Sequence, residues 1–169
     1  MSRACRVAFY DSPIGRILLA ESDEALVAIR FEASSTEESE GDLAPDGYEV
    51  QIGKSPLLER AKKELTEYFS GKRKVFSVPC RPRGTPFQRA VWEAVADIPY
   101  GETRTYLEIS TSAGSPRGCR ATGQAVGANR LPILIPCHRV VASGGTLGGF
   151  GAGLDIKKYL LDLEHRNSG

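Results

Sequence analysis

Residues 84–106 read GTPFQRAVWEAVADIPYGETRTY and contain the clearest helix signal in the chain. Thr85 is a favourable N-cap, Pro86 suits the first helical position, and Gln88 stands where its side chain can reach back to the cap. Apolar residues then recur at helical spacing, and IPYGE ends the segment as a turn. They are Ala90, Val91, Ala94, Val95 and Ile98. We therefore predict a helix from Pro86 that buries one face.

Two shorter helices are predicted next, over residues 103–112 and 116–128, with a Gly-containing turn between them. Such a pair is typical of a helix-turn-helix, although many other helix pairs look the same. The charged residues from 104 to 139 are Arg104, Arg117, Arg120, Arg130, Arg139 and Glu108, a net of 5 − 1 = +4. Such a basic stripe favours phosphate binding, and a solvated face is the alternative.

Residues 133–141 read ILIPCHRVV and place Cys137 beside His138 after an apolar, strand-like run. A thiolate is the attacking form of cysteine, and a nearby base promotes it. Adjacent side chains seldom face each other, so we expect a bridging water between them. A buried packing cysteine is the alternative for Cys137 alone.

A Gly-rich loop or hairpin follows at residues 142–149, and Asp155 is predicted to cap a last helix. Its apolar face consists of Ile156, Tyr159, Leu160 and Leu163. Glu164 falls in the final turn of this helix.

The first half of the chain predicts a small antiparallel sheet and one helix. Alternating apolar residues mark strands in RVAFYD, GRILLAE and ALVAIRFE, and SPIG reads as a turn. Residues 33–47 are predicted to form an exposed loop. The helix begins with Ser55 as N-cap and Pro56 at its first position, and Gly71 ends it.

The fold class is thus α/β in the wider sense, more strictly α+β, with two domains. Residues 1–78 form a sheet-and-helix domain, and residues 84–169 form a mainly helical domain that contains the helix-turn-helix. Residues 72–84 form the linker, with a possible strand at Val75–Val78.

Composition excludes several classes of protein. The chain has 169 residues, 41% hydrophobic and 25% charged, with net charge +1, and it lacks an apolar run of about 20 residues that would span a membrane. Its start shows no signal peptide, so a cytoplasmic location, or a nuclear one in a eukaryote, is expected. Its four cysteines form no C-x-x-C pair and only two histidines are present, so no metal and no cofactor are expected.

The second half resembles the O6-alkylguanine-DNA alkyltransferases, also called methylated-DNA–protein-cysteine methyltransferases. The resemblance rests on ILIPCHRVV together with GTPFQRAVWEAVADIPYGETRTY, RATGQAVGANRLP and GGFGAGLDIKKYLL, in this order over residues 84–164. The first 80 residues resemble the family in pattern only. The resemblance implies a single-turnover enzyme that irreversibly moves the alkyl group of O6-alkylguanine, or of O4-alkylthymine, from double-stranded DNA to Cys137. A monomer that repairs DNA without a membrane partner is expected.

The resemblance also implies residue roles. Cys137 accepts the alkyl group, His138 is a water-linked general base and Glu164 orients it, in a relay similar to hydrolase triads. Asn129 braces the turn before Cys137, and Tyr106 donates to the leaving guanine. Arg120 fills the gap left by a flipped nucleotide. The other implied DNA contacts are Arg117, Thr105, Ala121 and Gly123, and the implied pocket residues are Pro132, Val140, Phe150 and Gly151.

The small residues Ala121, Gly123, Ala125 and Gly127 suit close approach to a minor groove, whereas tight helix packing is the alternative. Phe150 stands where the family often has Tyr, and the histidines that bind zinc in the first domain of some members are missing.

Three other functions are open at this point. A non-enzymatic branch of the family binds alkylated DNA but lacks the acceptor cysteine. A helix-turn-helix regulator would bind DNA without a covalent gain of mass, and a thiol hydrolase would turn over repeatedly.

Overall fold

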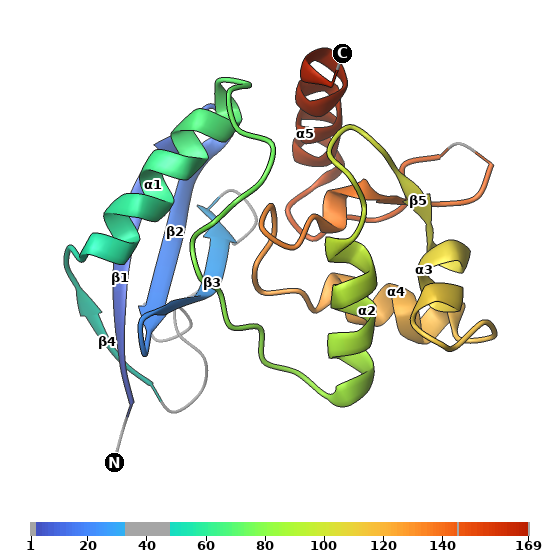
Figure 1. Ribbon diagram of the computed structural model, residues 1–169, viewed down its shortest axis with the longest axis horizontal. Coiled ribbons are helices and arrows are strands. Elements are labelled where there is room, and N and C mark those ends of the chain that lie inside the picture. Colours follow the sequence, from blue (N-terminus) through green and yellow to red (C-terminus); the bar gives the residue numbers. More distant parts are fainter. Residues whose placement is uncertain (1–2, 33–47, 145, 169) are drawn as a thin grey trace. The chain divides into compact units, whose positions relative to one another are not determined.

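The computed structural model describes residues 3–32, 48–144 and 146–168, so the loop expected at 33–47 lies outside the described residues. The chain divides into two compact units, unit 1 (Met1–Pro82) and unit 2 (Arg83–Gly169). Their elements are shown in Figure 1. The α+β class is confirmed, because unit 1 is built on a sheet and unit 2 mainly on helices.

Unit 1 contains a four-stranded sheet in the order β3-β2-β1-β4. The strands β1 (Arg3–Ser12), β2 (Gly15–Ser22) and β3 (Ala25–Phe31) pair antiparallel, as predicted. The fourth strand, β4 (Tyr48–Ile52), lies parallel to β1, so the sheet is mixed rather than purely antiparallel. This strand was missed because its pairing joins residues that are far apart in the sequence.

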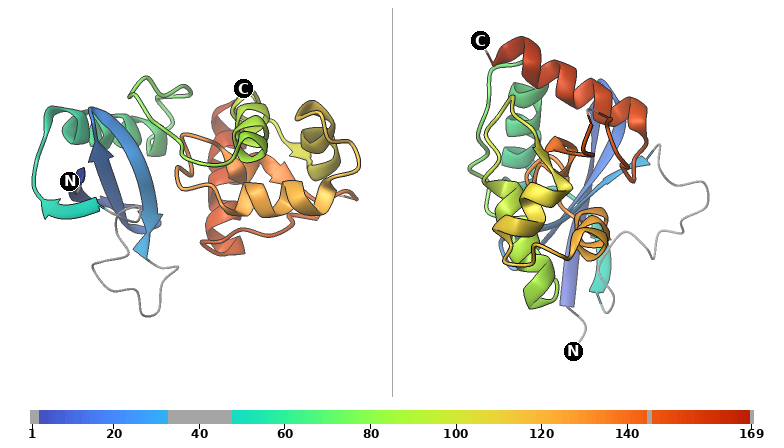
Figure 2. Two further views of the ribbon diagram at one scale, coloured as in Figure 1. Left: turned by 90° about the horizontal axis from the view of Figure 1, so that it is seen from below. Right: turned by 90° about the vertical axis from the view of Figure 1, so that its right-hand side faces the viewer.

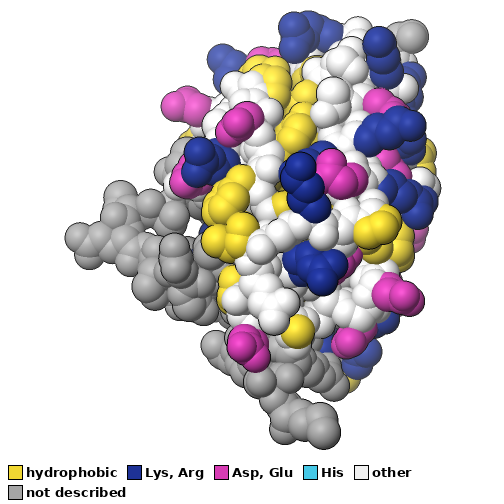
Figure 3. Space-filling model, turned by 90° about the vertical axis from the view of Figure 1, so that its left-hand side faces the viewer, with side chains coloured by type: hydrophobic (Ala, Val, Ile, Leu, Met, Phe, Trp, Pro, Cys, Tyr) yellow, Lys and Arg dark blue, Asp and Glu magenta, His cyan; other side chains and the backbone are white. Residues whose placement is uncertain are grey.

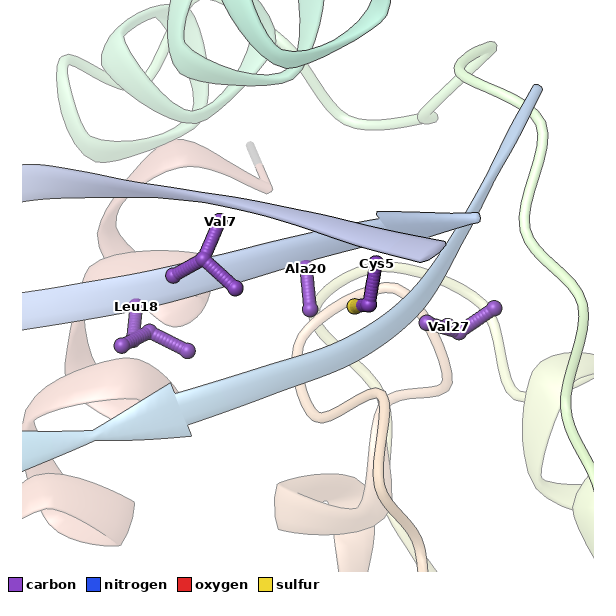
Figure 4. Packing of buried hydrophobic residues seen from close by; sticks show 5 residues of the cluster. All are labelled: Cys5, Val7, Leu18, Ala20 and Val27. Carbon is purple, nitrogen blue, oxygen red and sulfur yellow. The ribbon is translucent and has the colours of Figure 1, made fainter. Parts of the chain in front are cut away.

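The helix α1 (Pro56–Phe69) covers one face of the sheet (Figures 1 and 2). It begins as predicted, because the side chain of Ser55 accepts a hydrogen bond from the Leu58 amide at 3.0 Å. On the opposite face, five buried side chains of the strands form a cluster that points away from α1 (Figure 4). The cluster consists of Cys5, Val7, Leu18, Ala20 and Val27.

The stretch predicted as a linker is bonded to unit 1 through much of its length. Glu64 accepts hydrogen bonds from the amides of Ser77 and Val78, at 2.7 and 3.2 Å. Leu26 exchanges backbone hydrogen bonds with Pro79 and Arg81. Residues 75–78 are not a strand, and only a single bridge joins Cys80 to Leu26.

Unit 2 begins with α2 (Pro86–Ala96), whose capping box is formed by Thr85 and Gln88 as predicted. The next two helices, α3 (Tyr106–Ser112) and α4 (Cys119–Gly127), start three residues later than predicted. Together α2, α3 and α4 pack against one another (Figure 2). The last helix, α5 (Leu154–Asn167), has Gly153 as its N-cap, so the prediction of Asp155 as the cap is wrong.

The late start of α3 has a structural cause. Arg104–Thr105 form the short strand β5, which pairs parallel with β6 (Val140–Val141). Thr105 then caps α3, because its side chain accepts the Glu108 amide at 3.1 Å. This pairing attaches the beginning of α3 to the segment that immediately follows Cys137.

Candidate active site

Cys137 begins a single turn of 3₁₀ helix, η3 (Cys137–Arg139), and is buried. The preceding residues 131–136 form turns rather than the expected strand. Ile133 has a left-handed φ of 73°, an uncommon conformation for a β-branched residue. The cysteine is therefore held on a tightly turned backbone, with its amide donating to the Ile135 carbonyl at 2.7 Å.

Asn129 ties this turn together from the end of α4. Its side-chain amide donates to the Ile135 carbonyl at 2.9 Å, and its side-chain oxygen accepts the Leu131 amide at 2.9 Å. Both bonds close the loop that leads from α4 to Cys137.

His138 and Glu164 form a buried pair next to Cys137. His138 Nε2 lies 2.6 Å from Glu164 Oε2, and the two side chains are 0% and 1% exposed. Glu164 comes from α5, where it shares a buried stripe with Leu160. His138 Nδ1 is also buried and bonds to no group in the described part of the chain.

Arg139 lies in this buried network rather than on the exposed surface. Its Nε donates to Glu164 Oε1 at 2.7 Å and its Nη2 to Glu164 Oε2 at 3.1 Å. The prediction that Arg139 belongs to an exposed basic stripe is therefore wrong. Arg104, another member of the stripe, lies within 4 Å of both Glu102 and Glu108, which offset its charge. The exposed arginines that remain in the stripe are Arg117, Arg120 and Arg130.

Lys157 is a buried cation that we did not predict from the sequence. Its Nζ donates to the carbonyls of Val140 at 2.7 Å, Gly149 at 3.1 Å and Leu147. It therefore joins α5 to β6 and to the Gly-rich loop. Its helical spacing from Leu160 and Glu164 was a usable signal, because residues 157, 160 and 164 fall on one face of α5.

Burial and the neighbouring charges together set the protonation of the site. Burial raises the pKa of the Cys137 thiol, an effect that Asn129, Lys157 and backbone amides oppose. Burial also lowers the pKa of His138, and the bond to Glu164 opposes that shift only in part. Burial alone would raise the pKa of Glu164, but His138 and Arg139 lower it to about 2. The site thus holds a neutral thiol, a neutral imidazole and a carboxylate at neutral pH.

Tyr106, at the start of α3, lies against the Gly-rich loop. Its hydroxyl donates to the Gly149 carbonyl at 3.5 Å, and a Cβ on Gly148 would come within 3.0 Å of its ring. Of the predicted pocket residues, Pro132 and Val140 are buried, Phe150 is half-buried and Gly151 is exposed.

The helix α4 presents Arg120 and Ala121 to solvent, and Arg117 is exposed just before it. A Cβ placed on Gly123 or Gly127 would meet no atom within 4 Å. Internal packing therefore does not require glycine at either position. On its inner side, α4 is fixed to α2 by the Trp92 indole, which donates to the Ala125 carbonyl at 2.8 Å.

Charge is distributed differently on unit 1. On the face shown in Figure 3, Lys and Arg side chains are interspersed with Asp and Glu. Among the described residues, no helix is long and apolar enough to cross a membrane. In the same part of the chain, no group of three or more His, Cys, Asp or Glu side chains is placed to hold a metal ion, and the absence of a metal remains a prediction.

Both units match family models. Residues 5–82 match the ribonuclease-like domain of 6-O-methylguanine DNA methyltransferase, and residues 86–166 match the DNA-binding domain of the same family. The methylated-DNA–protein-cysteine methyltransferase of Methanosarcina acetivorans is 42% identical over 93% of this chain and 96% of its own length. The constitutive enzyme of Bacillus subtilis is 39% identical over 91% and 92%.

Solved structures that resemble this chain belong to proteins of the same kind as these relatives. The crystal structure of Mycobacterium tuberculosis O6-methylguanine methyltransferase matches with a TM-score of 0.84 and 36% identity, over 98% of this chain and 95% of that one. The structure of Mycobacterium tuberculosis OGT in complex with DNA matches with a TM-score of 0.83 and 37% identity, over 96% and 94%. The chain therefore belongs to the 6-O-methylguanine DNA methyltransferase family.

Proposed function

We propose that this protein repairs O6-alkylguanine in DNA by transferring the alkyl group to the sulfur of Cys137. Relatives that align with nearly the whole chain carry the name methylated-DNA–protein-cysteine methyltransferase. The observation that carries the proposal is the buried His138–Glu164 pair, with 2.6 Å between Nε2 and Oε2, directly after the cysteine. This pair is a base with its orienting group, which a buried packing cysteine would not need.

The proton path follows from the hydrogen bonds. An ionised Glu164 can only accept, so His138 Nε2 carries the proton of their bond and Nδ1 has a free lone pair. The S–H bond of Cys137 breaks, and a bridging water passes a proton to Nδ1. The thiolate then forms an S–C bond while the bond from the alkyl carbon to the guanine oxygen breaks. Its electron pair stays on the guanine, which takes a proton.

The groups around the sulfur suit recognition of a base. We assign proton donation to Tyr106, whose hydroxyl lies at the Gly-rich loop. Phe150 and Gly151 of that loop, with Pro132 and Val140, are assigned to the walls of the pocket. Asn129 is assigned to hold the turn that presents Cys137, which its two bonds to that turn support.

The surface of α4 suits the DNA. A base within a duplex cannot reach a buried thiol, so the nucleotide must be flipped out. Glycine in a helix costs roughly 0.5–1 kcal/mol relative to alanine, and the open surroundings of Gly123 and Gly127 give no internal reason for it. Close approach of α4 to a DNA minor groove would give a reason for glycine at these positions. We assign Arg120 to fill the gap that the flipped nucleotide leaves in the base stack. Arg117, Thr105 and Ala121 are assigned to contact the DNA around this gap.

The thioether product has no leaving group that would restore the thiol, so we propose one transfer per molecule. O4-alkylthymine is proposed as a second substrate. We propose a monomer in the compartment that holds the DNA, the cytoplasm in a prokaryote, where the four free thiols would stay reduced.

Intact mass spectrometry tests the proposal. The protein is incubated with a duplex that carries one O6-methylguanine, and the expected gain is one methyl group, located on Cys137 by peptide mapping. Cys137→Ser should gain nothing and still bind the duplex. Cys80→Ser, which removes an exposed cysteine of unit 1, is the matched control and should gain the methyl group normally. Binding without a gain of mass by the wild type would contradict the proposal and favour a DNA-binding protein.

A further inference from the structure

Arg139 is held on three sides in the interior of unit 2. Its Nε and Nη2 donate to the two oxygens of Glu164, and its Nη1 donates to the Ile98 carbonyl at 2.7 Å. The guanidinium carbon lies 5.6 Å from the centre of the Tyr100 ring. The side chain is 8% exposed, so this charge is committed to the interior and is not offered to a phosphate.

Glu164 is in turn surrounded by donors. It accepts from His138, twice from Arg139, and from the Gly101 amide at 3.3 Å. A carboxylate can satisfy all of these donors only while it is ionised. A buried carboxylate that lost its cation would instead tend to take up a proton.

We infer that Arg139 is a positioning residue that keeps Glu164 ionised and thereby holds His138 in the tautomer whose Nδ1 can accept the Cys137 proton. This inference rests on the proposed function. In the step concerned, the S–H bond of Cys137 breaks and an N–H bond forms at Nδ1 through water. The positive charge then on His138 stays there, because Glu164 remains a carboxylate.

Loss of Arg139 would invert this relay. A protonated Glu164 would donate to His138 Nε2, so Nε2 would become the acceptor and Nδ1 would carry the hydrogen. An Nδ1–H group cannot take a proton from the thiol. The other charged or titratable groups that face the pair are Tyr100, from the turn after α2, and Lys157, from α5. Arg139 places one donor on each of the two Glu164 oxygens, Nε on Oε1 and Nη2 on Oε2.

Nitrogen-15 NMR of histidine reads the tautomer directly. The chain has only two histidines, so a His165→Gln background leaves the signal of His138 alone. The variants are Arg139→Met, Arg139→Lys and, as matched control, Arg166→Met, an exposed arginine on α5. The second readout is the single-turnover rate with free O6-methylguanine base from pH 5 to 9, which avoids DNA binding.

The wild type and Arg166→Met should show a neutral His138 with its hydrogen on Nε2. Arg139→Met should move the hydrogen to Nδ1 at neutral pH and slow transfer roughly tenfold or more, with a deficit that shrinks as the pH rises. Arg139→Lys should fall between them. In a Glu164→Gln background, Arg139→Met should slow the reaction little further.

A wild-type His138 with its hydrogen on Nδ1 would overturn the inference. This measurement uses the wild-type side chain at position 139, so it tests the inference even if Arg139→Met does not fold. An unchanged tautomer and an unchanged pH profile in folded Arg139→Met or Arg139→Lys would also overturn it. Failure of the proposed function is distinct, since the wild type would then gain no alkyl group at all.

Discussion

His138 Nε2 lies 2.6 Å from Glu164 Oε2, although the two residues are 26 positions apart in the chain. One side chain comes from η3, directly after Cys137, and the other from the last turns of α5. The docking of α5 therefore decides whether the cysteine has an oriented base. Stability of this helix and reactivity of Cys137 should accordingly change together.

Glu164→Gln should show this link through pH. The folded pKa of Glu164 is about 2, below the ordinary value of 4.5. The carboxylate therefore stabilises the fold above about pH 4.5, and this stability is lost as the pH falls toward 2. At neutral pH the wild type should exceed Glu164→Gln by up to about 3 kcal/mol in free energy of unfolding. Urea unfolding at several pH values measures the difference, which should shrink in acid.

Glu108→Gln is the control, because this exposed carboxylate on α3 makes a surface ion pair with Arg104. The difference in free energy of unfolding between Glu108→Gln and the wild type should be nearly independent of pH. A constant difference between the wild type and Glu164→Gln from pH 7 to pH 2 would contradict the assigned charge of Glu164.

Lys157→Met should loosen the Gly-rich loop. The ammonium group donates to three carbonyls, on β6 and in the loop, and hydrogen bonds of a charged group contribute about 1.5–3 kcal/mol each. We expect lower stability, faster amide exchange at residues 147–150, and slower alkyl transfer from both duplex and free base. Lys158→Met, at the exposed neighbouring position, should leave all three unchanged. Normal exchange in the loop of Lys157→Met would contradict the anchoring role.

Local signals in the sequence predicted the local features of the fold. The caps of Ser55 and Thr85 were correct because N-capping involves residues only three positions apart. The strand β4 was missed because its partner β1 lies more than 40 residues away, across a segment without a pattern. The strand β5 was taken as helix for the same reason, since it forms only by pairing with Val140–Val141.

In the candidate site, too, features that depend on distant partners were harder to predict than local ones. Motif resemblance predicted a site at Cys137, His138 and Glu164, and the structure brings the side chains of His138 and Glu164 together directly after Cys137. Arg139 was assigned to the surface, because an arginine is usually exposed and its burial depends on a carboxylate from α5. Lys157 was overlooked for the same reason, although its place on the buried stripe of α5 was readable.

Gly123→Ala should separate folding from DNA repair. The added Cβ meets no atom within 4 Å, so the free energy of unfolding should rise by about 0.5–1 kcal/mol. Repair of methylated duplex should become slower, as with Arg120→Ala, while the reaction with free O6-methylguanine base should not change. Equal rates on duplex for Gly123→Ala and the wild type would show that glycine is not needed for close approach there.

Substitutions of Phe150 test what its aromatic ring contributes to alkyl transfer. We expect an apolar wall, because backbone amides of the loop can read the base edge whatever the side chain. Phe150→Tyr should then leave the single-turnover rate on methylated duplex nearly unchanged, and Phe150→Ala should lower it. If a hydroxyl mattered, Phe150→Tyr would gain about tenfold, the value of one good hydrogen bond. A gain of that size would rule out the wall.

We propose that Cys137 takes one alkyl group and keeps it. The most direct measurement is a titration of the protein with increasing equivalents of O6-methylguanine duplex, followed by intact mass and by the number of guanines restored. We expect both signals to stop at one methyl group per protein, on Cys137, whatever the excess of DNA. No gain of mass, or more than one guanine restored per protein molecule, would contradict it.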